Sequence, residues 1–323
     1  MTQTRRRHAG PTRREFLIGG AAALLLAGCG TQGGGAASGG KRSIKHKFGV
    51  AEVPENPERI VAVGYNEADF VLAFGVVPVG VRDFIGPYPE ETRPWAQEQL
   101  DGAEPKLVGG EEINFEAVAA LEPDLILGVY SFMTQADYDF LAEIAPTVAQ
   151  PARHVDGGTP WQEQTLITGR ALGMETRAKE VVGEVEGRFA EARENYPELE
   201  GKTAAVTFAF QGEYSILTPD DLRTLLFTSL GLRLPEETGS ISRERVDLLD
   251  QDLLIFLGAD REVLEADELV QSLDAAREGR IVYFGDFGTD FAGALGYSSP
   301  LSLPFALEEA APRLAAAVDG SRA

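Results

Sequence analysis

The feature that most constrains the fold is a long helical pattern in the middle of the chain, over residues 159–197. Apolar residues recur there at steps of three and four from Ile167 to Ala192, so they lie along one face of a helix. Pro160 suits the first turn of a helix, and Pro197 ends the pattern. A helix of roughly 35 residues is about 50 Å long, which is too long for an ordinary crossover between strands. The pattern therefore predicts one long helix that joins two lobes.

The segments on both sides of this helix alternate short apolar runs with helical patterns. Before it the runs are "RIVAVG", "VPVGV", "DLILGV" and "TVAQP", and after it they are "KTAAVTFAF", "YSILT", "DLLIFLG" and "RIVYFG". Continuous runs of Val, Ile and Leu between helices are typical of parallel sheets that helices cover on both faces. We therefore predict an α/β protein of two lobes with mainly parallel sheets, over residues 44–158 and 198–323.

The two lobes also contain an internal repeat. The segment "NFEAVAALEPDLI" matches "SRERVDLLDQDLL" at a constant offset of 128 residues. Each copy begins with a good N-cap residue, Asn114 or Ser242, and has a glutamate in the first helical turn, Glu116 or Glu244. The helix dipole favours a glutamate there by about 0.3–1 kcal/mol. That effect does not predict the same residue at the same place in both lobes, so the pair is a candidate functional feature.

The first residues of the chain have the pattern of an export signal. Residues 1–28 combine five arginines with an apolar run that is shorter than a membrane span. The paired arginines of "TRREFLIGG" resemble a twin-arginine signal, and "LAGC" resembles the lipobox of bacterial lipoproteins. The resemblance implies cleavage before Cys29, the only cysteine, and a lipid on its sulfur that anchors the protein on the extracytoplasmic side of the cell membrane. We expect the Gly/Ser-rich residues 29–43 to be a flexible tether.

The net charge excludes several classes of partner. Residues 1–28 hold five arginines and one glutamate, so the rest of the chain has a formal charge of −26, against −22 for the whole. Nucleic-acid binding needs a basic surface, and so acidic a protein is repelled by anionic lipid. We therefore expect no nucleic-acid partner and no membrane contact apart from the lipid anchor.

No catalytic or metal-binding motif is visible in the region expected to fold. It lacks a phosphate-binding loop, an HExxH motif and a nucleophile elbow. The three histidines, His8, His46 and His154, are far apart in the sequence, whereas a bare metal ion needs clustered ligands. We predict a protein that is not an enzyme, with no catalytic residues, no metal site and no resident cofactor.

Polar and aromatic side chains follow several of the predicted strands. Because ligands of open parallel sheets bind outside the carboxyl ends of the strands, these residues are candidates for a binding cleft. The candidates are Tyr65, Arg82, Tyr88, Trp95, Tyr130, Phe210, Tyr214 and Arg223. Arginines and aromatic rings suit a large ligand that is anionic or rich in oxygen. Arg82 is the strongest candidate, because an arginine beyond a buried strand seldom packs well without a partner. Tyr65 and Phe210 would serve equally well as core residues.

Several stretches together resemble the ferric-siderophore substrate-binding proteins of bacterial ABC importers. They are "NPERIVAVGYNEADFVLAFGVVPVGV", "INFEAVAALEPDLILG", "LAEIAPTV", "WQEQTLITGRALG", "ISRERVDLLDQDLLIFLG" and "GRIVYFGD", and the similarity runs from about Pro57 to Val318. The resemblance implies two α/β lobes joined by one long helix, a shallow cleft, and delivery of an iron chelate to a membrane permease. It also places Glu116 and Glu244 on the surface that meets a two-fold permease dimer. The family has no universal ligand motif, so the cleft residues rest on their positions after strands.

The resulting hypothesis is a monomeric, lipid-anchored protein for iron uptake that binds an iron(III)–siderophore complex and serves an ABC importer. A siderophore supplies all the iron ligands, which agrees with the missing histidine cluster. The same fold binding cobalamin or haem is an alternative, and Tyr65, Tyr88 or Tyr130 would then be an axial ligand for haem. A secreted enzyme is the alternative from another class.

Overall fold

The structure is a computed structural model of the chain. The residues that it describes are 40–84, 86–89, 92–210 and 213–320. The chain divides into residues 1–38 and a second unit of residues 39–323. The predicted signal peptide and the lipidation site Cys29 lie outside the described residues. None of the helices in the described part combines the length and the apolarity that a membrane span requires.

The N-terminal lobe contains a five-stranded sheet of order β5-β4-β3-β6-β7, in which all neighbouring strands are parallel. The strands are β3 (Ile60–Ala62), β4 (Gly80–Val81), β5 (Lys106–Leu107), β6 (Leu125–Gly128) and β7 (Thr147–Ala149). The helices of this lobe are α1 (Glu67–Leu72), α2 (Gln97–Leu100), α3 (Phe115–Ala120) and α4 (Gln135–Ile144). Leu125 and Leu127 of β6 belong to one apolar cluster and Ile126 to another. Both faces of the sheet are therefore buried, which explains the continuous apolar run.

A β-hairpin precedes this sheet, and the sequence reasoning missed it. It consists of β1 (Lys41–His46) and β2 (Gly49–Pro54), which pair antiparallel. Ile44, Ala51 and Val53 pack into the core of the N-terminal lobe. The predicted tether of residues 29–43 is therefore wrong at its end, because regular structure begins at Lys41. The sequence signal that could have found it is the alternation of apolar and polar residues, as in Ala51-Glu52-Val53, which is typical of a strand with one buried face.

The C-terminal lobe contains a second five-stranded sheet, of order β10-β9-β8-β11-β12. The strands are β8 (Ala204–Phe210), β9 (Glu213–Ile216), β10 (Gly239–Ile241), β11 (Leu253–Leu257) and β12 (Ile281–Tyr283). The pairs β8–β11 and β11–β12 are parallel, and β8–β9 and β9–β10 are antiparallel. The helices are α7 (Thr224–Ser229), the 3-10 helices η2 (Pro197–Leu199) and η3 (Arg243–Leu249), α8 (Arg261–Glu265), α9 (Glu268–Gln271), α10 (Asp274–Arg277), α11 (Asp290–Tyr297) and α12 (Ser302–Val318).

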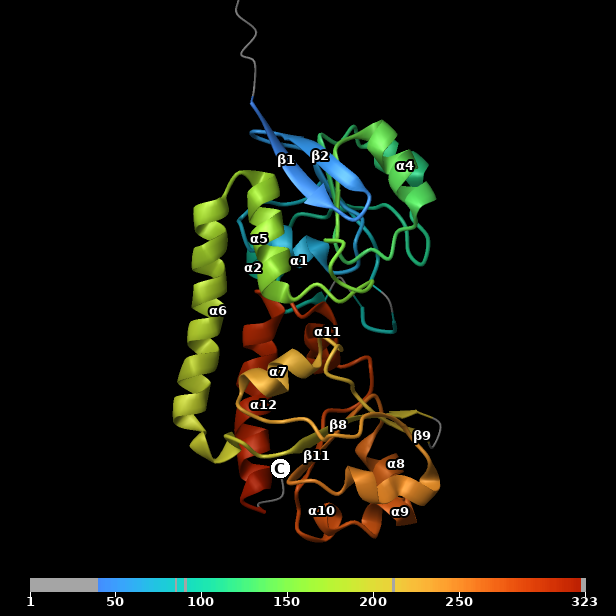
Figure 1. Ribbon diagram of the computed structural model, residues 1–323, viewed down its shortest axis with the longest axis vertical. Coiled ribbons are helices and arrows are strands. Elements are labelled where there is room, and N and C mark those ends of the chain that lie inside the picture. The colour runs from blue at the N-terminus through green and yellow to red at the C-terminus, as the bar shows by residue number, and fades with distance from the viewer. Residues whose placement is uncertain (1–39, 85, 90–91, 211–212, 321–323) are drawn as a thin grey trace, which may run out of the picture. The chain divides into compact units, whose positions relative to one another are not determined.

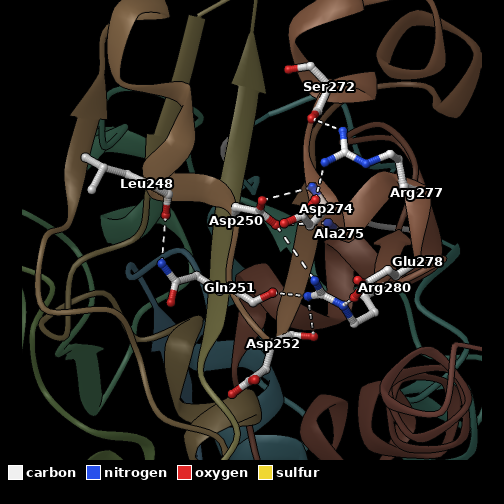
Figure 2. A network of polar contacts seen from close by, with 10 residues as sticks. All are labelled: Leu248, Asp250, Gln251, Asp252, Ser272, Asp274, Ala275, Arg277, Glu278 and Arg280. Atoms are coloured by element: carbon white, nitrogen blue, oxygen red, sulfur yellow. Dashed lines mark hydrogen bonds and ion pairs between the residues drawn. The ribbon is translucent and has the colours of Figure 1, made fainter.

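A polar network fixes the start of β11 against α10 and β12 (Figure 2). The two carboxylate oxygens of Asp250 accept hydrogen bonds from the backbone N–H groups of Asp274 and Ala275, both at 2.9 Å, and so cap the first turn of α10. The Arg280 guanidinium donates to the carbonyls of Gln251 and Asp252, at the residues that lead into β11. These bonds anchor the amino ends of the parallel strands. A ligand would bind at the other edge of the sheet, at their carboxyl ends.

The predicted single helix over residues 159–197 is two helices, α5 (Trp161–Leu172) and α6 (Glu175–Asn195). The chain turns at Gly173, which has a left-handed φ of 76° and ends α5. The helices then pack so closely that a Cβ on Gly169 would lie 2.4 Å from the Cβ of Ala178.

The connection between the lobes is still one long helix, because α6 alone spans them. Ala178 near its start packs into the core of the N-terminal lobe. Phe189 and Ala192 near its end belong to the large cluster that includes the core of the C-terminal lobe. Figure 1 shows α6 running beside both lobes, next to α5 along its first half and next to α12 along its second half. The α/β class, the two lobes and the single connecting helix are confirmed, and only the extent of that helix was wrong.

Candidate ligand-binding cleft

A cleft lies between the lobes, at the carboxyl ends of their strands. It consists of two adjoining cavities of about 230 and 340 Å³, which share Phe84, Arg223 and Gly296 in their walls. The first is lined mainly by residues of the C-terminal lobe, among them Phe208, Leu257, Phe284, Phe287, Phe291 and Leu295. The second is lined from both lobes, by Tyr65, Asn66, Tyr130, Phe132, Val155, Asp156, Asp220, Asp221 and Ser298, among others.

Aromatic rings form much of the wall of the cleft. In the N-terminal lobe, Phe132 packs edge-on against Tyr130 at a ring-centre distance of 5.1 Å and tilts against Tyr65 at 6.2 Å. In the C-terminal lobe, Phe208 packs edge-on against Phe287 at 5.3 Å. Phe132 is held in a left-handed backbone conformation, with φ of 54°, and nearly half of its surface is exposed. Such rings offer apolar faces to a large ligand without needing hydrogen bonds from it.

Arg223 is the basic side chain among the described residues that line the cleft. Its guanidinium lies over the Phe208 ring, 4.3 Å from the ring centre. Both carboxylate oxygens of Asp221 accept hydrogen bonds from it, the Nε–Oδ1 bond at 2.7 Å. The charge of Arg223 is therefore largely neutralised by its own neighbour in the sequence.

Arg82, the strongest candidate from the sequence, is buried behind the cleft, with 5% of its surface exposed. All five of its N–H groups donate hydrogen bonds, and the acceptors are the carbonyls of Val63, Gly110, Glu111 and Ser131 and the hydroxyl of Tyr65. The guanidinium also stacks on the Tyr65 ring, 3.9 Å from its centre. The predicted partner of Arg82 is therefore not a ligand but the backbone of the N-terminal lobe.

Glu67 lies fully buried below the second cavity, at the start of α1. Its Oε1 accepts hydrogen bonds from the Tyr130 N–H at 2.5 Å and from the Gln164 side chain at 3.1 Å, while its Oε2 has no partner in the described structure. Burial raises the pKa of Glu67 to about 7, and the hydrogen bonds from the backbone oppose that rise. Tyr130, which lines the cleft, is therefore fixed by a titratable group.

A second buried carboxylate joins the two lobes behind the cleft. Asp69 accepts hydrogen bonds from Arg93 at 2.7 Å, from the Trp95 indole at 2.7 Å and from Ser299 of the C-terminal lobe at 2.8 Å. Beside it, the Asn66 amide donates to the Tyr297 carbonyl at 3.0 Å. Buried polar groups hold a unique arrangement when they are all satisfied, so this network fixes the lobes at their junction.

Tyr88 and Trp95 belong to this junction. Their rings stack at 5.6 Å, and Trp95 also packs against Tyr297 of α11. The Tyr88 hydroxyl lies 3.0 Å from Oδ1 of Asp290, and burial raises its pKa to about 12, so it donates this bond as a neutral phenol. Tyr88 still lines the first cavity, whereas Trp95 is behind it.

A family model described as "periplasmic binding protein" matches residues 60–286, which is well over half of the chain. This chain belongs to the periplasmic binding protein family. The match places it among binding proteins rather than enzymes, as the sequence predicted.

Relatives of this periplasmic binding protein have names that refer to iron and siderophores. It is 30% identical over 212 residues to a probable siderophore-binding lipoprotein of Bacillus subtilis; the match covers 64% of this chain and 61% of that relative. The structure resembles a periplasmic solute binding protein from Mycobacterium smegmatis, at 34% identity and a TM-score of 0.79, covering 86% of this chain and 99% of the other. It also resembles the Streptococcus pneumoniae protein PiaA in complex with ferrichrome, at 28% identity and a TM-score of 0.72, covering 86% of this chain and 99% of that one.

Two of the sequence candidates lie elsewhere in this periplasmic binding protein. Tyr214 is buried in the core of the C-terminal lobe, where it packs against Phe256 and its hydroxyl donates to Asp267 at 2.8 Å. Tyr214 pairs with Ala209 near the carboxyl end of β8, but its side chain lies on the face of the sheet that packs into the core, so position along the strand alone misplaced it. Phe210 is exposed at the end of β8 but does not line either cavity.

The sequence reasoning did not single out several aromatic residues of the cleft. Phe84, Phe208, Phe284 and Phe291 all line the first cavity. Phe84 and Phe284 follow β4 and β12, so the rule that selected Arg82 would have found them. Phe208 lies within β8 and resembles a core residue in the sequence. Only the packing of the lobes shows that its ring faces the cleft.

The repeat is present in the structure, with one difference. Asp124 and Asp252 each accept hydrogen bonds from backbone N–H groups just before the adjoining strand, at Glu58 and Arg59 in one lobe and at Thr203 in the other. Asn114 caps α3 through its side chain, but the expected side-chain cap from Ser242 is absent, and η3 is a 3-10 helix. Glu116 and Glu244 are both exposed in the first turns of these helices.

Proposed function

We propose that this periplasmic binding protein captures an iron(III)–siderophore complex outside the cytoplasm and delivers it to the permease of an ABC importer. The observation that supports this most directly is the cleft between the lobes, walled by aromatic rings and with a single basic residue among its described lining. Such a surface suits a bulky ligand that is recognised from outside. The named relatives, which include a probable siderophore-binding lipoprotein and a ferric-anguibactin-binding protein, support the same ligand class.

The iron in this proposal arrives fully chelated, as cargo rather than as a resident cofactor. Among the described residues, no group of three or more His, Cys, Asp or Glu side chains is arranged to hold a metal ion. His46 is buried against Phe48 and Tyr138, and His154 pairs with Glu163 at 2.8 Å, so neither histidine lines the cleft. The aromatic walls would instead contact the organic shell of the chelate.

The test is quenching of tryptophan fluorescence by a panel of ligands. Trp95 is the reporter, because it stacks on Tyr88, which lines the first cavity. The panel comprises ferric hydroxamate, catecholate and carboxylate siderophores, haem and cobalamin, each with its iron-free form where one exists. Saturable quenching by a ferric siderophore and none by haem or cobalamin is the expected result. Binding of haem or cobalamin alone would replace the siderophore by the alternative ligand. Tyr65, Tyr88 and Tyr130 all line the cavities and would then be the candidates for an axial haem ligand.

The proposed location outside the cell membrane depends on Cys29. We propose that this residue is lipidated after export and is the only attachment of the protein to the membrane. Cys29→Ala should release the protein from the membrane fraction, because two acyl chains are needed for stable anchoring, while ligand quenching by the purified protein stays unchanged. Retention of the variant in membranes after a high-salt wash would contradict the anchor.

A further inference from the structure

The charges around the cleft determine which chelates it can accept. We infer that the cleft selects ferric chelates that are neutral or positively charged and discriminates against anionic ones. This inference rests on the proposed function and adds to it the charge class of the ligand. It departs from the expectation from sequence, which allowed an anionic ligand held by Arg82.

The only cation among the described lining residues is not available to an anion. Arg223 is bound through two of its nitrogens by Asp221 and lies flat on the Phe208 ring. To bind an anionic ligand, the guanidinium would have to give up a partner that already matches its geometry. An anion in the cleft would also meet the Asp221 carboxylate beside it.

Carboxylates outnumber the cation in the same walls. The lining contains Asp156, Asp220 and Asp221. Asp156 is paired with Lys47 at 2.5 Å, and Asp221 with Arg223. Asp220 is exposed and makes no ion pair with any residue that the structure describes. It therefore leaves one uncompensated negative charge at the cleft.

The remaining neighbours do not reverse this sign. Two further cations lie near the second cavity without lining it: Lys47 is paired with Asp156, and Arg82 has all its N–H groups bound and stacks on the Tyr65 ring. The residues between 40 and 320 that the structure does not describe are Ile85, Glu90, Glu91, Gln211 and Gly212, and none of them is basic.

The aromatic walls favour the same class of ligand. The faces of Tyr130, Phe132 and Phe84 have negative quadrupoles, which attract cationic groups and repel anionic ones. An ammonium group on the periphery of a chelate could lie against these rings and beside Asp220. Recognition would therefore come from ring faces and carboxylates rather than from arginines.

The experiment compares three forms of one chelate that differ only in the charge of a peripheral group. Ferrioxamine B has a free amine and one positive charge; its N-acetyl derivative is neutral, and its N-succinyl derivative has one negative charge. The iron shell is the same in all three. We expect the amine to bind at least as tightly as the acetyl form, and the succinyl form to bind roughly tenfold more weakly than the amine. The difference should shrink at high salt, since exposed charges are screened.

Variants locate the charge that is responsible. Asp220→Asn should reduce the preference for the amine over the succinyl form by about threefold or more. Asp221→Asn should strengthen succinyl binding, because it frees Arg223. Asp247→Asn is the matched control, since its carboxylate is 74% exposed on η3 and outside the cleft. Melting temperatures of all three establish that they are folded.

The outcomes separate this inference from the proposed function. If ferrioxamines do not bind, neutral ferrichrome and the triply anionic ferric enterobactin are compared, and tighter binding of the anionic complex overturns the inference. Tighter binding of the succinyl form, or an unchanged preference in Asp220→Asn, also overturns it while the siderophore function stands. Failure of every ferric chelate to bind would overturn both.

Discussion

Two arginines near the cleft have opposite surroundings, although the sequence presents them alike. Arg82 is buried and donates all its hydrogen bonds to the N-terminal lobe, four of them to backbone carbonyls. Arg223 is about one-third exposed and has a carboxylate partner two residues away. The first arginine therefore joins the loops that follow the strands of its lobe, and the second belongs to the cleft surface.

The surroundings of Arg82 predict a loss of stability when its charge is removed. Arg82→Met keeps much of the stem but leaves three of its four carbonyl partners without a side-chain donor, since only the Glu111 carbonyl still accepts from the Tyr65 hydroxyl. The free energy of unfolding should therefore fall by about 3 kcal/mol. Arg223→Met is the control and should change it by less than about 1 kcal/mol, because the ion pair is partly exposed. Urea unfolding of both variants measures the difference. A fully stable Arg82→Met that has lost ligand binding would restore Arg82 as a ligand contact.

Glu67 predicts how stability depends on pH. Folding raises its pKa from the ordinary 4.5 to about 7, so the folded state keeps a proton that the unfolded state has lost. Its contribution is therefore most favourable below about pH 4.5 and is lost as the pH rises to about 7. Glu67→Gln keeps the shape and removes the titration. As the pH rises from 4.5 to about 7, the free energy of unfolding of the variant should increase by about 3 kcal/mol relative to that of the wild type. Urea unfolding of both proteins at several pH values measures this difference. Parallel curves for both proteins would show that Glu67 does not titrate there.

At the level of helices and strands, the turn at Gly173 folds α5 back against α6, so that α6 alone connects the two lobes. Gly173 has a left-handed φ, and an added Cβ would lie 2.9 Å from the Arg42 guanidinium. Arg42 donates to the carbonyls of Arg170 and Ala171 at the end of α5, at 2.9 and 3.2 Å. The hairpin β1–β2 is thereby attached to the helix end.

Substitutions of glycine separate this turn from ordinary helix positions. Gly173→Ala should lower the free energy of unfolding by about 1–2 kcal/mol, from left-handed strain and displacement of Arg42. Gly183→Ala in α6, where an added Cβ meets no atom within 4 Å, should raise it by about 0.5–1 kcal/mol. Thermal or urea unfolding of both variants tests the pair. Stabilisation by both would mean that the turn is not required.

At the scale of the whole molecule, the repeat places one exposed glutamate on each lobe. Glu116 belongs to α3 and Glu244 to η3, and both helices are short, so the dipole that each glutamate meets is small. A partner with two equivalent basic patches would match them. Complementary charges of this kind act mainly on the rate and orientation of docking.

Charge reversal of this pair tests delivery to the permease. The double variant Glu116→Arg with Glu244→Arg should abolish iron uptake in cells and leave chelate affinity within about twofold, or ~0.4 kcal/mol. Each single reversal should impair uptake less than the pair. Radiolabelled-iron uptake and melting temperature are measured on all three variants. Normal uptake by the double variant would rule out a docking role for the two glutamates. A lower melting temperature in the same variant would show that they only stabilise their helices through the helix dipole.

The class of fold could be predicted from the sequence alone, because strand and helix patterns depend on neighbours along the chain. The apolar runs at β3, β6, β8 and β11 and the stripe through α6 were visible as periodicity. The repeat was visible for the same reason. The stripe did not reveal the turn at Gly173, since two helices packed side by side show the same period as one.

Which side chains face the cleft depends on contacts between distant parts of the chain and could not be predicted from the sequence. Arg82 could not be distinguished from a ligand contact, because its acceptors come from residues 63–131, spread over several loops. Tyr214 lies near the carboxyl end of β8, but its side chain is on the face of the sheet that packs into the core. Phe208, on β8 of the C-terminal lobe, lines the cleft together with Phe84 and Tyr88 of the N-terminal lobe. The charge of a binding site depends on which residues meet in space. The pairing of Arg223 with Asp221, and the uncompensated charge of Asp220, could therefore be recognised only in the folded structure.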